Sequence, residues 1–550
     1  MLEGVVPFPP DLAARYRARG YWQDRSLISV FDEVFERYSD RVALIDDHTS
    51  VTYQELADRS RLLARHLLDL GFKPLDRIVV QLPNTVMFAY LYFALQRIGA
   101  IPILALPVHR RREVDQFVSL AGARACAVPS KTKDFDFVKM VEALMERHED
   151  LGLCLVQGLD PAQASDRFVS LEGLMESEPS TPESALGGVR IDPDDPAVFL
   201  LSGGTTGIPK LIARTHNDYA FNSQLAASVC DIRDGDVVLL VLPIEHNLPL
   251  ACPGMQGFLL KGATALLSMA RRSEEVFELV ERHRVTHVHV VPALLIKWIS
   301  DPSATKHDLS SLHIIQSGGQ RLQPEVRQRA QSLVPRCFIQ ENFGMAEGLI
   351  MFVRIDDPDE VRRETCGRPV CEDDVVYLVD EEGAEVPQGE VGELIVRGPY
   401  TLHGYFRSPE YNARAFTPSG FYRSGDLLRK DRTGNYVVEG RRKDLINRGG
   451  EKISAEEVEN LILSHPSVQN VACVPYPDEV LGERMCACVV LHPGSTLELP
   501  ELVQFLSDCE IAKFKLPERL EILDELPLSG FGKVSKKELA AMLAATVSAD

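Results

Sequence analysis

The segment 202–210 contains a combination of residues that could hold phosphate groups. It has the sequence SGGTTGIPK, with adjacent glycines, three hydroxyl side chains and a lysine at its end. Glycines let backbone N–H groups approach an anion closely, and the hydroxyls and the ammonium group add donors and positive charge. The apolar run 197–201 precedes it, and a strand that feeds such a turn is typical of a phosphate-binding loop. The common P-loop spacing is absent, and a surface loop without a ligand is the alternative when this segment is taken alone.

Two carboxylates follow glycine-containing turns after apolar runs. Glu347 lies in the segment 343–348 (FGMAEG), and Asp426 ends the segment 422–426 (YRSGD), where we expect a strand to end. A glutamate near a phosphate loop can hold Mg²⁺ between phosphate oxygens. An aspartate at the end of a strand can accept hydrogen bonds from ribose hydroxyls. Taken alone, each could instead be an ordinary surface glutamate or a turn-forming aspartate.

Charged, glycine-flanked segments follow in the last quarter of the chain. The segments 440–444 (GRRKD) and 447–452 (NRGGEK) lie at a proposed domain boundary, where hinges belong. The segment 527–533 (PLSGFGK) ends with Lys533 on a glycine loop. The alternatives are a solvated run of charges for the first two segments and a disordered basic tail for the last.

The bulk properties indicate a large cytoplasmic enzyme. The 550 residues are 45% hydrophobic, which predicts two or more cores. The net charge of −21 argues against a nucleic-acid or membrane partner. Neither a membrane-spanning apolar run nor a signal peptide is expected. The eleven cysteines lack a Cys-x-x-Cys pair, so neither zinc nor disulfides are suggested.

Apolar strand-like runs alternate with helix-period segments over the first two-thirds of the chain. Helices are expected at 26–38, 52–70 and 86–98, and strands at 77–82, 101–105, 237–243, 285–291 and 312–317. This rhythm predicts an α/β fold with mostly parallel sheets flanked by helices. The proline-containing stretch 158–196 is expected to be a surface connection. Short alternating strands from about 374 to 438 predict a small β-rich subdomain, followed by a C-terminal domain.

In this order and at these separations, the segments resemble the adenylate-forming superfamily of acyl and aryl ligases, from about residue 32 to 537. The resemblance implies an N-terminal domain over 1–440, with two mostly parallel sheets and the β-rich subdomain. A small mobile α+β domain over 441–550 would carry Lys533. In the first half-reaction a carboxylate attacks the α-phosphorus of ATP, which gives acyl-AMP and pyrophosphate. A thiol then attacks the mixed anhydride.

The resemblance also assigns roles to residues that match the family's motifs. The phosphates would be held by Ser202, Gly203, Gly204, Thr205, Thr206, Gly207 and Lys210. The adenine would contact Gly318, Gly319, Gln320, Phe343 and Gly344, and the ribose would contact Asp426 and Arg441. Mg²⁺ would be held by Thr206 and Glu347, which with Lys533 form the expected catalytic set. Lys533 would reach the carboxylate and α-phosphate, where a preorganised cation stabilises developing charge. The hinge would be Lys443, and the thiol would approach past Arg448, Gly449 and Gly450.

The segment 245–254 (EHNLPLACPG) resembles the acid-binding segment of stand-alone aryl-acid ligases that feed siderophore assembly lines and related peptide synthetases. In that subgroup the asparagine pairs with the acid's ortho-hydroxyl and carboxylate, and Asn247 suits a 2-hydroxyaryl acid. Cys252 replaces a serine that is usual with 2,3-dihydroxybenzoate, so it favours salicylate, with dihydroxybenzoate next. Leu248 replaces an aromatic residue and opens space for a heteroaryl acid. The expected pocket comprises His246, Asn247, Leu248, Cys252, Gly319, Met345 and Ile350. A packed polar core residue is the alternative for His246.

The thiol acceptor is expected to be the phosphopantetheine arm of an aryl carrier protein on a separate chain. Lysines that could dock an acidic carrier are Lys513, Lys515, Lys536 and Lys537. An aryl-CoA ligase that uses free coenzyme A is the close alternative. A phosphoryl-transfer ATPase or kinase and a catalytically inert scaffold are alternatives from other classes. The absent P-loop pattern argues against the former, and the retained charged residues argue against the latter.

Overall fold

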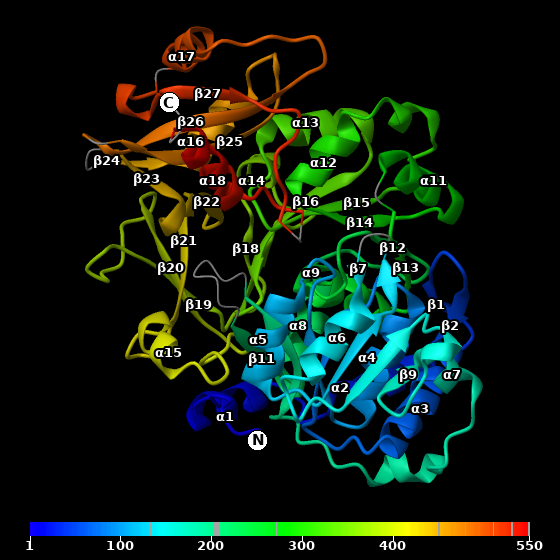
Figure 1. Cartoon of the computed structure of the whole chain (residues 1–550). Coiled ribbons are helices and arrows are strands. Elements are labelled where there is room, and N and C mark those ends of the chain that lie inside the picture. The colour runs from blue at the N-terminus through cyan, green and yellow to red at the C-terminus, as the bar shows by residue number, and fades with distance from the viewer. Residues whose placement is uncertain are drawn as a thin grey trace.

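Short apolar strands and amphipathic helices assemble into two large, mostly parallel sheets, which confirms the expected α/β class (Figure 1). The computed structural model describes residues 1–132, 135–202, 210–270, 272–448, 451–478, 480–509, 511–529 and 532–547. Within them the side chains of Pro161, Lys443, Lys452 and residues 544–547 are not described.

The first sheet has nine strands in the order β18-β17-β16-β15-β14-β12-β13-β1-β2. Its pairs are parallel from β16 through β1 and antiparallel at both edges. The strands are β1 (Val42–Ile45), β2 (Ser50–Thr52), β12 (Val237–Leu240), β13 (Thr264–Leu267), β14 (His287–Val290), β15 (Ile314–Ser317), β16 (Phe338–Met345), β17 (Gly348–Phe352) and β18 (Arg368–Pro369). The register brings Val290 and Ser317, the last residues of β14 and β15, level with Glu341 in β16, because Ser317 pairs with Val290 on one side and Glu341 on the other. The carboxyl ends of parallel strands are where such sheets bind ligands.

The second sheet has seven strands in the order β11-β10-β4-β3-β5-β8-β9, and only the β10–β11 pair is antiparallel. The strands are β3 (Arg77–Val80), β4 (Ile101–Leu104), β5 (Ala125–Pro129), β8 (Leu153–Gln157), β9 (Phe168–Ser170), β10 (Pro196–Leu201) and β11 (Leu211–Thr215). A separate two-stranded ribbon pairs β6 (Lys131–Thr132) with β7 (Phe135–Asp136). The expectation that 158–196 is only a connection is wrong, because β9 extends this sheet and α7 (Leu171–Glu176) follows. β9 is too short to show an alternating pattern of apolar and polar residues in the sequence, and it forms through backbone pairing with β8.

Helices cover both sheets and fill the space between them. One hydrophobic cluster spans the facing sides of both sheets and includes the helices α2 (Leu27–Arg37), α3 (Tyr53–Asp69), α4 (Val86–Arg97), α8 (His216–Ser228), α9 (Asn247–Ala251) and α10 (Gly254–Leu260). The outer face of the seven-stranded sheet packs on α5 (Arg111–Ala121) and α6 (Phe137–Met145). The outer face of the nine-stranded sheet packs on α11 (Ser273–His283), α12 (Pro292–Ile299) and α13 (Pro324–Leu333). Other helices in this part are α1 (Pro10–Ala18), η1 (Pro161–Gln163), η2 (Glu183–Gly188), η3 (Pro302–Lys306), α14 (Asp359–Glu364) and α15 (Pro409–Ala415).

The expected β-rich subdomain is a four-stranded antiparallel sheet. It consists of β19 (Val375–Val379), β20 (Val391–Arg397), β21 (Tyr422–Lys430) and β22 (Tyr436–Arg441) in sequence order. The short helix η4 (Arg442–Asp444) follows directly. The subdomain therefore leads the chain from the large sheets to the C-terminal elements.

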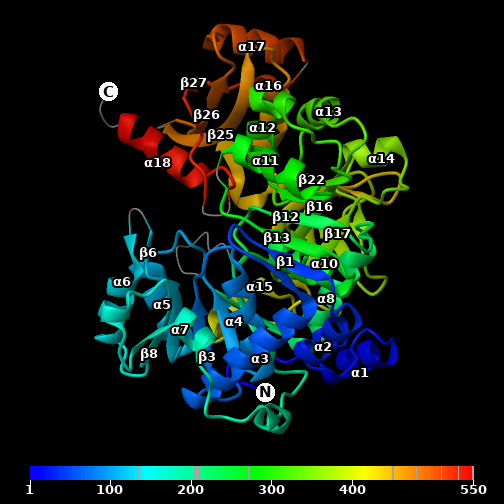
Figure 2. The same cartoon turned by 90° about the vertical axis from the view of Figure 1, so that its right-hand side faces the viewer.

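The C-terminal elements form a further mixed sheet flanked by helices. Its strands are β23 (Leu445–Arg448), β24 (Glu451–Ser454), β25 (Val468–Asp478), β26 (Gly482–Leu491) and β27 (Arg519–Ile522). The helices are α16 (Ala455–Leu463), α17 (Leu499–Asp508), η5 (Lys513–Lys515) and α18 (Lys536–Val547). Figures 1 and 2 show these orange-to-red elements gathered at one end of the molecule. The domain boundary expected at residue 440 stays a prediction.

All eleven cysteines lie in the described part of the chain, and none of them forms a disulfide there. Ten are buried, whereas Cys509 at the end of α17 is exposed. Over the described residues, the helices lack the length and apolar character that crossing a membrane requires.

Candidate active site

A cleft of about 790 Å³ lies between the carboxyl edge of the nine-stranded sheet, the β-rich subdomain and the C-terminal elements. Polar residues from all three parts line it. Those expected from the sequence are Gly319, Gln320, Phe343, Gly344, Asp426, Arg441 and Lys533. The structure therefore brings together side chains that lie far apart in the sequence.

The loop after β15 forms one wall of this cleft. Gly318 adjoins the Asn342 side chain so closely that a Cβ atom at position 318 would lie 2.2 Å from Asn342 Oδ1. Gly319 has a φ of +86°, which favours glycine. The loop is held by Glu341, whose Oε1 accepts a hydrogen bond from the Leu322 backbone at 3.1 Å. Gly318 thus allows the close packing against Asn342, and Gly319, which lines the cleft, presents only backbone to it.

Asp426 and Arg441 face each other across the β21–β22 pair. The Arg441 Nε lies 2.7 Å from Asp426 Oδ1. Asp426 is buried and raises the pKa of the half-exposed Arg441 guanidinium. The expectation that a strand ends at Asp426 is wrong, because β21 continues to Lys430. A register shift and Gly425, with a φ of +73°, reorient the backbone at this point instead.

Lys533 enters the cleft from the C-terminal elements. Its loop is closed by the Ser529 N–H, which donates to the Lys533 carbonyl at 2.6 Å. A Cβ atom at Gly532 would lie 3.4 Å from the Val291 side chain, which directly follows β14, so the loop packs against the large sheet. Burial, and then the charge of Lys533, lower the pKa of His246 to about 3. Lys533 therefore acts electrostatically on the acid-binding segment.

Lys210 and Glu347 lie close enough to interact electrostatically. Lys210 is buried with its Nζ 4.0 Å from the centre of the Tyr411 ring, and Glu347 accepts a hydrogen bond from the Tyr405 hydroxyl at 2.7 Å. Burial lowers the pKa of Lys210, and the Glu347 charge opposes that shift. Glu347 sits in the tight turn between β16 and β17, where Met345 pairs with Gly348. This geometry places a carboxylate from the nine-stranded sheet and an ammonium group next to the seven-stranded sheet beside Tyr405 and Tyr411.

The phosphate-loop residues Gly203, Gly204, Thr205, Thr206 and Gly207 lie outside the described residues. The two ends of that loop are held together, because the Ser202 N–H donates to the Lys210 carbonyl at 3.0 Å. Ser202 Oγ is buried and has no hydrogen-bond partner among the described residues. A buried hydroxyl of this kind fits a phosphate oxygen, since buried polar groups are nearly always paired. The residues present therefore suit a nucleotide, with Glu347 as a carboxylate for Mg²⁺.

The expected acid-binding residues converge on α9 and on the β16–β17 hairpin. His246 caps α9, and its Nδ1 accepts the Leu248 N–H at 3.3 Å. Asn247 Oδ1 accepts the Tyr219 hydroxyl at 3.0 Å, and Asn247 Nδ2 donates to Cys252 Sγ at 3.2 Å. Leu248, Cys252 and Ile350 belong to the core cluster between the sheets, and the partly buried Met345 packs against it. Asn247 and Cys252 thus form one hydrogen-bonded unit.

The expected hinge and thiol-channel residues are placed only in part. Lys443 lies in η4, and its side chain is outside the described part. Gly449 and Gly450 also lie outside it. Arg448 pairs with Glu518 at 2.7 Å within the C-terminal sheet. The roles expected for these residues stay predictions.

Comparisons with known proteins agree with this arrangement. A family model described as AMP-binding enzyme matches residues 31–406, and one described as AMP-binding enzyme C-terminal domain matches residues 457–533. The chain belongs to the AMP-binding enzyme family. A Streptomyces protein named salicylyl-CoA synthase / salicylate adenylyltransferase is 46% identical, over 98% of this chain and 97% of its own. The salicyl-AMP ligase / salicyl-S-ArCP synthetase of Mycobacterium tuberculosis is 42% identical, over 98% and 95%. The apo structure of Mycobacterium smegmatis MbtA is 40% identical with a TM-score of 0.74, covering 98% of each chain.

Membership of this family confirms the expected resemblance and makes the protein an adenylate-forming ligase. Several polar residues beside the site were nevertheless not predicted from the sequence. Arg214, Asn222 and Tyr219 support the acid-binding segment, and Tyr405 and Tyr411 contact Glu347 and Lys210. One signal in the sequence could have pointed to Arg214, Asn222 and Tyr219. Thr215 and Asp218 form a capping box at the start of α8, next to Arg214.

Proposed function

We propose that this ligase activates a 2-hydroxyaryl carboxylic acid with ATP, with salicylate preferred and 2,3-dihydroxybenzoate next. The observation that carries the proposal is the placement of Lys533. It lines the same cleft as Asp426 and Arg441, and its charge acts on His246 beside Asn247. A cation at this point can stabilise both the acid's carboxylate and the charge that develops on the α-phosphoryl group.

In the first step an oxygen of the acid's carboxylate bonds to the α-phosphorus, and the bond to pyrophosphate breaks. Lys533 orients the carboxylate, Asp426 holds the ribose hydroxyls, and Lys210 neutralises the departing phosphates. Bound Mg²⁺, held by Glu347 and Thr206, would supply charge neutralisation to the phosphate oxygens. His246 stays neutral at working pH, because burial and Lys533 hold its pKa near 3. It therefore acts as a hydrogen-bonding group and not as a cation.

Cys252 supports the preference for salicylate. Its sulfur already accepts N–H groups from Asn222 and Asn247 at 3.4 and 3.2 Å, and the residue is buried. A second ring hydroxyl placed against this sulfur gains only a weak partner, which costs about 1–3 kcal/mol if that hydroxyl is buried. Names of relatives also support an aryl acid, including the salicyl-AMP ligase and the 2,3-dihydroxybenzoate-AMP ligase of Bacillus subtilis at 39% identity.

For the second step we propose transfer to the phosphopantetheine thiol of an aryl carrier protein on a separate chain. The relative named salicyl-S-ArCP synthetase supports this acceptor. Free coenzyme A is the second candidate, because the name of the 46% identical relative contains salicylyl-CoA synthase. Presenting the preformed aryl-AMP with either acceptor and measuring thioester formation separates the two.

ATP–pyrophosphate exchange tests the first step. The panel holds salicylate, 2,3-dihydroxybenzoate, benzoate, 3-hydroxypicolinate and quinaldate. Exchange led by salicylate is expected. Exchange led by dihydroxybenzoate would contradict the argument from Cys252, and exchange led by a heteroaryl acid would make Leu248 the deciding residue. Absence of exchange with every acid would contradict aryl-acid activation.

A further inference from the structure

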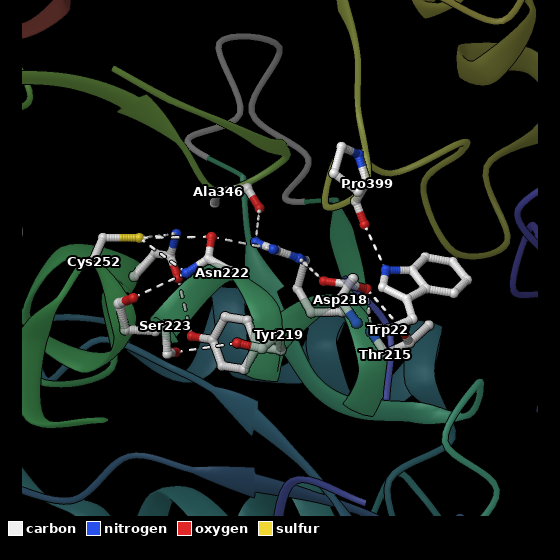
Figure 3. A network of polar contacts seen from close by, with 12 residues as sticks. Trp22, Thr215, Asp218, Tyr219, Asn222, Ser223, Cys252, Ala346 and Pro399 are labelled. Carbon is white, nitrogen blue, oxygen red and sulfur yellow. Dashed lines mark hydrogen bonds and ion pairs between the residues drawn. The ribbon is translucent and has the colours of Figure 1, made fainter. Parts of the chain in front are cut away.

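Two buried amide side chains, Asn222 and Asn247, meet at the sulfur of Cys252. Figure 3 shows Asn222 beside Cys252. Asn222 comes from α8 and Asn247 from α9, so the sulfur links the two helices. Each amide has an accepting oxygen and a donating nitrogen. On the proposed function, the orientation of Asn247 decides which polar atom the acid-binding segment offers to an acid.

Arg214 fixes the orientation of Asn222. A guanidinium group can only donate, and Arg214 donates to Asn222 Oδ1 at 3.3 Å. The opposite end, Asn222 Nδ2, donates to the Ala251 carbonyl at 2.9 Å. Arg214 can only donate and the Ala251 carbonyl can only accept, so turning the Asn222 amide would break two buried hydrogen bonds.

Asp218 holds Arg214 in position. Both side chains are almost fully buried, and the Arg214 Nε donates to Asp218 Oδ1 at 2.7 Å. Burial opposes the charge of Arg214, yet Asp218 raises the pKa of the guanidinium above its usual value. The same guanidinium donates to the Ala346 carbonyl at 3.1 Å, next to Glu347. Arg214 thus connects the acid-binding segment with the hairpin that carries Glu347.

The orientation of Asn222 that Arg214 fixes also determines the direction of the hydrogen bonds at Asn247. The Cys252 thiol faces Asn222 Oδ1 at 3.8 Å, which leaves its sulfur to accept from Asn247 Nδ2 at 3.2 Å. Asn247 Oδ1 then faces Tyr219, whose hydroxyl donates at 3.0 Å. Burial raises the pKa of Tyr219 far above its usual value, so this donor keeps its proton.

We propose that Arg214 and Tyr219 are positioning residues that make the pocket present an N–H donor of Asn247 to the ortho substituent of the acid. This inference rests on the proposed function. In salicylate the hydroxyl hydrogen can turn toward the acid's own carboxylate, so the oxygen accepts from Asn247. In 2-aminobenzoate one amino hydrogen turns toward the acid's own carboxylate. The other points at the Asn247 N–H, so two donors face each other. The pocket therefore rejects an ortho-amino group and accepts an ortho-hydroxyl group.

The test compares kcat/KM for salicylate and 2-aminobenzoate in pyrophosphate exchange. In the unmodified enzyme salicylate is expected to lead by about tenfold or more, because a buried donor left without an acceptor is costly. Tyr219→Phe frees Asn247 to turn and offer its oxygen, so this ratio falls about tenfold. The change is expected in the KM of the acids, with the KM of ATP unchanged.

Tyr53→Phe is the matched control. Tyr53 is equally buried, and its hydroxyl donates to the carbonyls of Leu259 and Ala263, away from the cleft. It should lower stability without moving the ratio. Arg214→Lys keeps a cation opposite Asp218 but loses the branched donors, so it should shift the ratio in the same direction as Tyr219→Phe. Arg214→Lys also tests the inference if Tyr219→Phe fails to fold.

An unchanged ratio in folded Tyr219→Phe or Arg214→Lys would overturn the inference while leaving the proposed function intact. A ratio that moves equally in Tyr53→Phe would also overturn it. Unmodified enzyme that exchanges with no aryl acid would contradict the proposed function, and the inference with it.

Discussion

At the scale of single residues, the candidate active site depends on a few charges held by burial and pairing. Asp426 is buried against Arg441, and Lys210 lies over Tyr411 within reach of the Glu347 charge. Lys533 differs from these because it comes from a separate part of the chain and lies on a short loop. Its effect on the reaction should therefore be separable from nucleotide binding.

Replacing Lys533 with alanine tests this separation. Lys533→Ala should lower acyl-AMP formation about a hundredfold or more, because a preorganised cation is lost where charge develops. Preformed aryl-AMP should still be consumed at a normal rate. The measurement is pyrophosphate exchange beside thioester formation, with Lys261→Ala, an exposed lysine at the end of α10, as control. Full exchange activity in Lys533→Ala would contradict the assigned role.

Asp374 gives a prediction about stability and pH. Burial raises its pKa to about 7 although Tyr400 donates a hydrogen bond to it. The folded state therefore binds an extra proton between about pH 4 and pH 7, and the free energy of unfolding falls as pH rises through this interval. At about 1.4 kcal/mol per pKa unit, the loss is at most about 4 kcal/mol.

Asp374→Asn should remove this contribution, so that the variant gains stability relative to the unmodified protein as pH rises from about 4 to about 7. Denaturant unfolding at several pH values measures the slope. Asp166→Asn, at an exposed position, should leave the slope unchanged. Parallel pH profiles for Asp374→Asn and the unmodified protein would be the contrary result.

At the scale of elements, the β16–β17 hairpin joins the two halves of the site. Its turn carries Glu347, its strands carry Phe343 and Ile350, and Arg214 holds its Ala346 carbonyl. Shifts in this hairpin therefore reach the nucleotide cleft and the acid-binding segment together.

The short helix η4 is the element at which the C-terminal part is expected to rotate. Lys443→Pro fixes φ at that residue and should hold the two parts in one arrangement. We expect acyl-AMP formation to continue and thioester formation to stop. Burst measurements of each half-reaction check this, with Lys443→Ala as control, which keeps φ free. Normal thioester formation in Lys443→Pro would argue against rotation about this residue.

Sequence patterns located the buried elements well and the polar contacts poorly. The apolar runs around Val79, Leu239 and Val288 predicted β3, β12 and β14, because strands buried on both faces leave a continuous apolar signal. Asp426 was placed at the end of a strand because the bulge at Gly425 has no such signal. The contact of Arg214 with Ala346 joins residues 132 positions apart, and no local pattern encodes it.

At the scale of the whole molecule, the proposed carrier must dock on a strongly acidic protein. Two of the four expected lysines are already paired, Lys515 with Glu457 and Lys536 with Glu459, each at 2.6 Å. Lys513 and Lys537 are exposed, but Lys537 also lines the active-site cleft, so Lys513 remains as the candidate for a docking patch outside the cleft lining.

Reversing the charge of Lys513 tests the docking patch. The variant Lys513→Glu should weaken thioester formation with the carrier at low salt and leave pyrophosphate exchange unchanged, because rim charges mainly set association rates. Lys261→Glu changes an exposed charge at the end of α10 and serves as control. Equal losses in both half-reactions would contradict docking at this patch.

The distribution of thiols makes the molecule convenient for spectroscopy. Cys509 is the exposed cysteine among the described residues, and it lies on the C-terminal elements, whereas the other ten are shielded. A maleimide dye should therefore attach at one place without prior mutagenesis. With a nucleotide analogue as the second fluorophore in the cleft, energy transfer would follow the proposed rotation in real time during a single turnover.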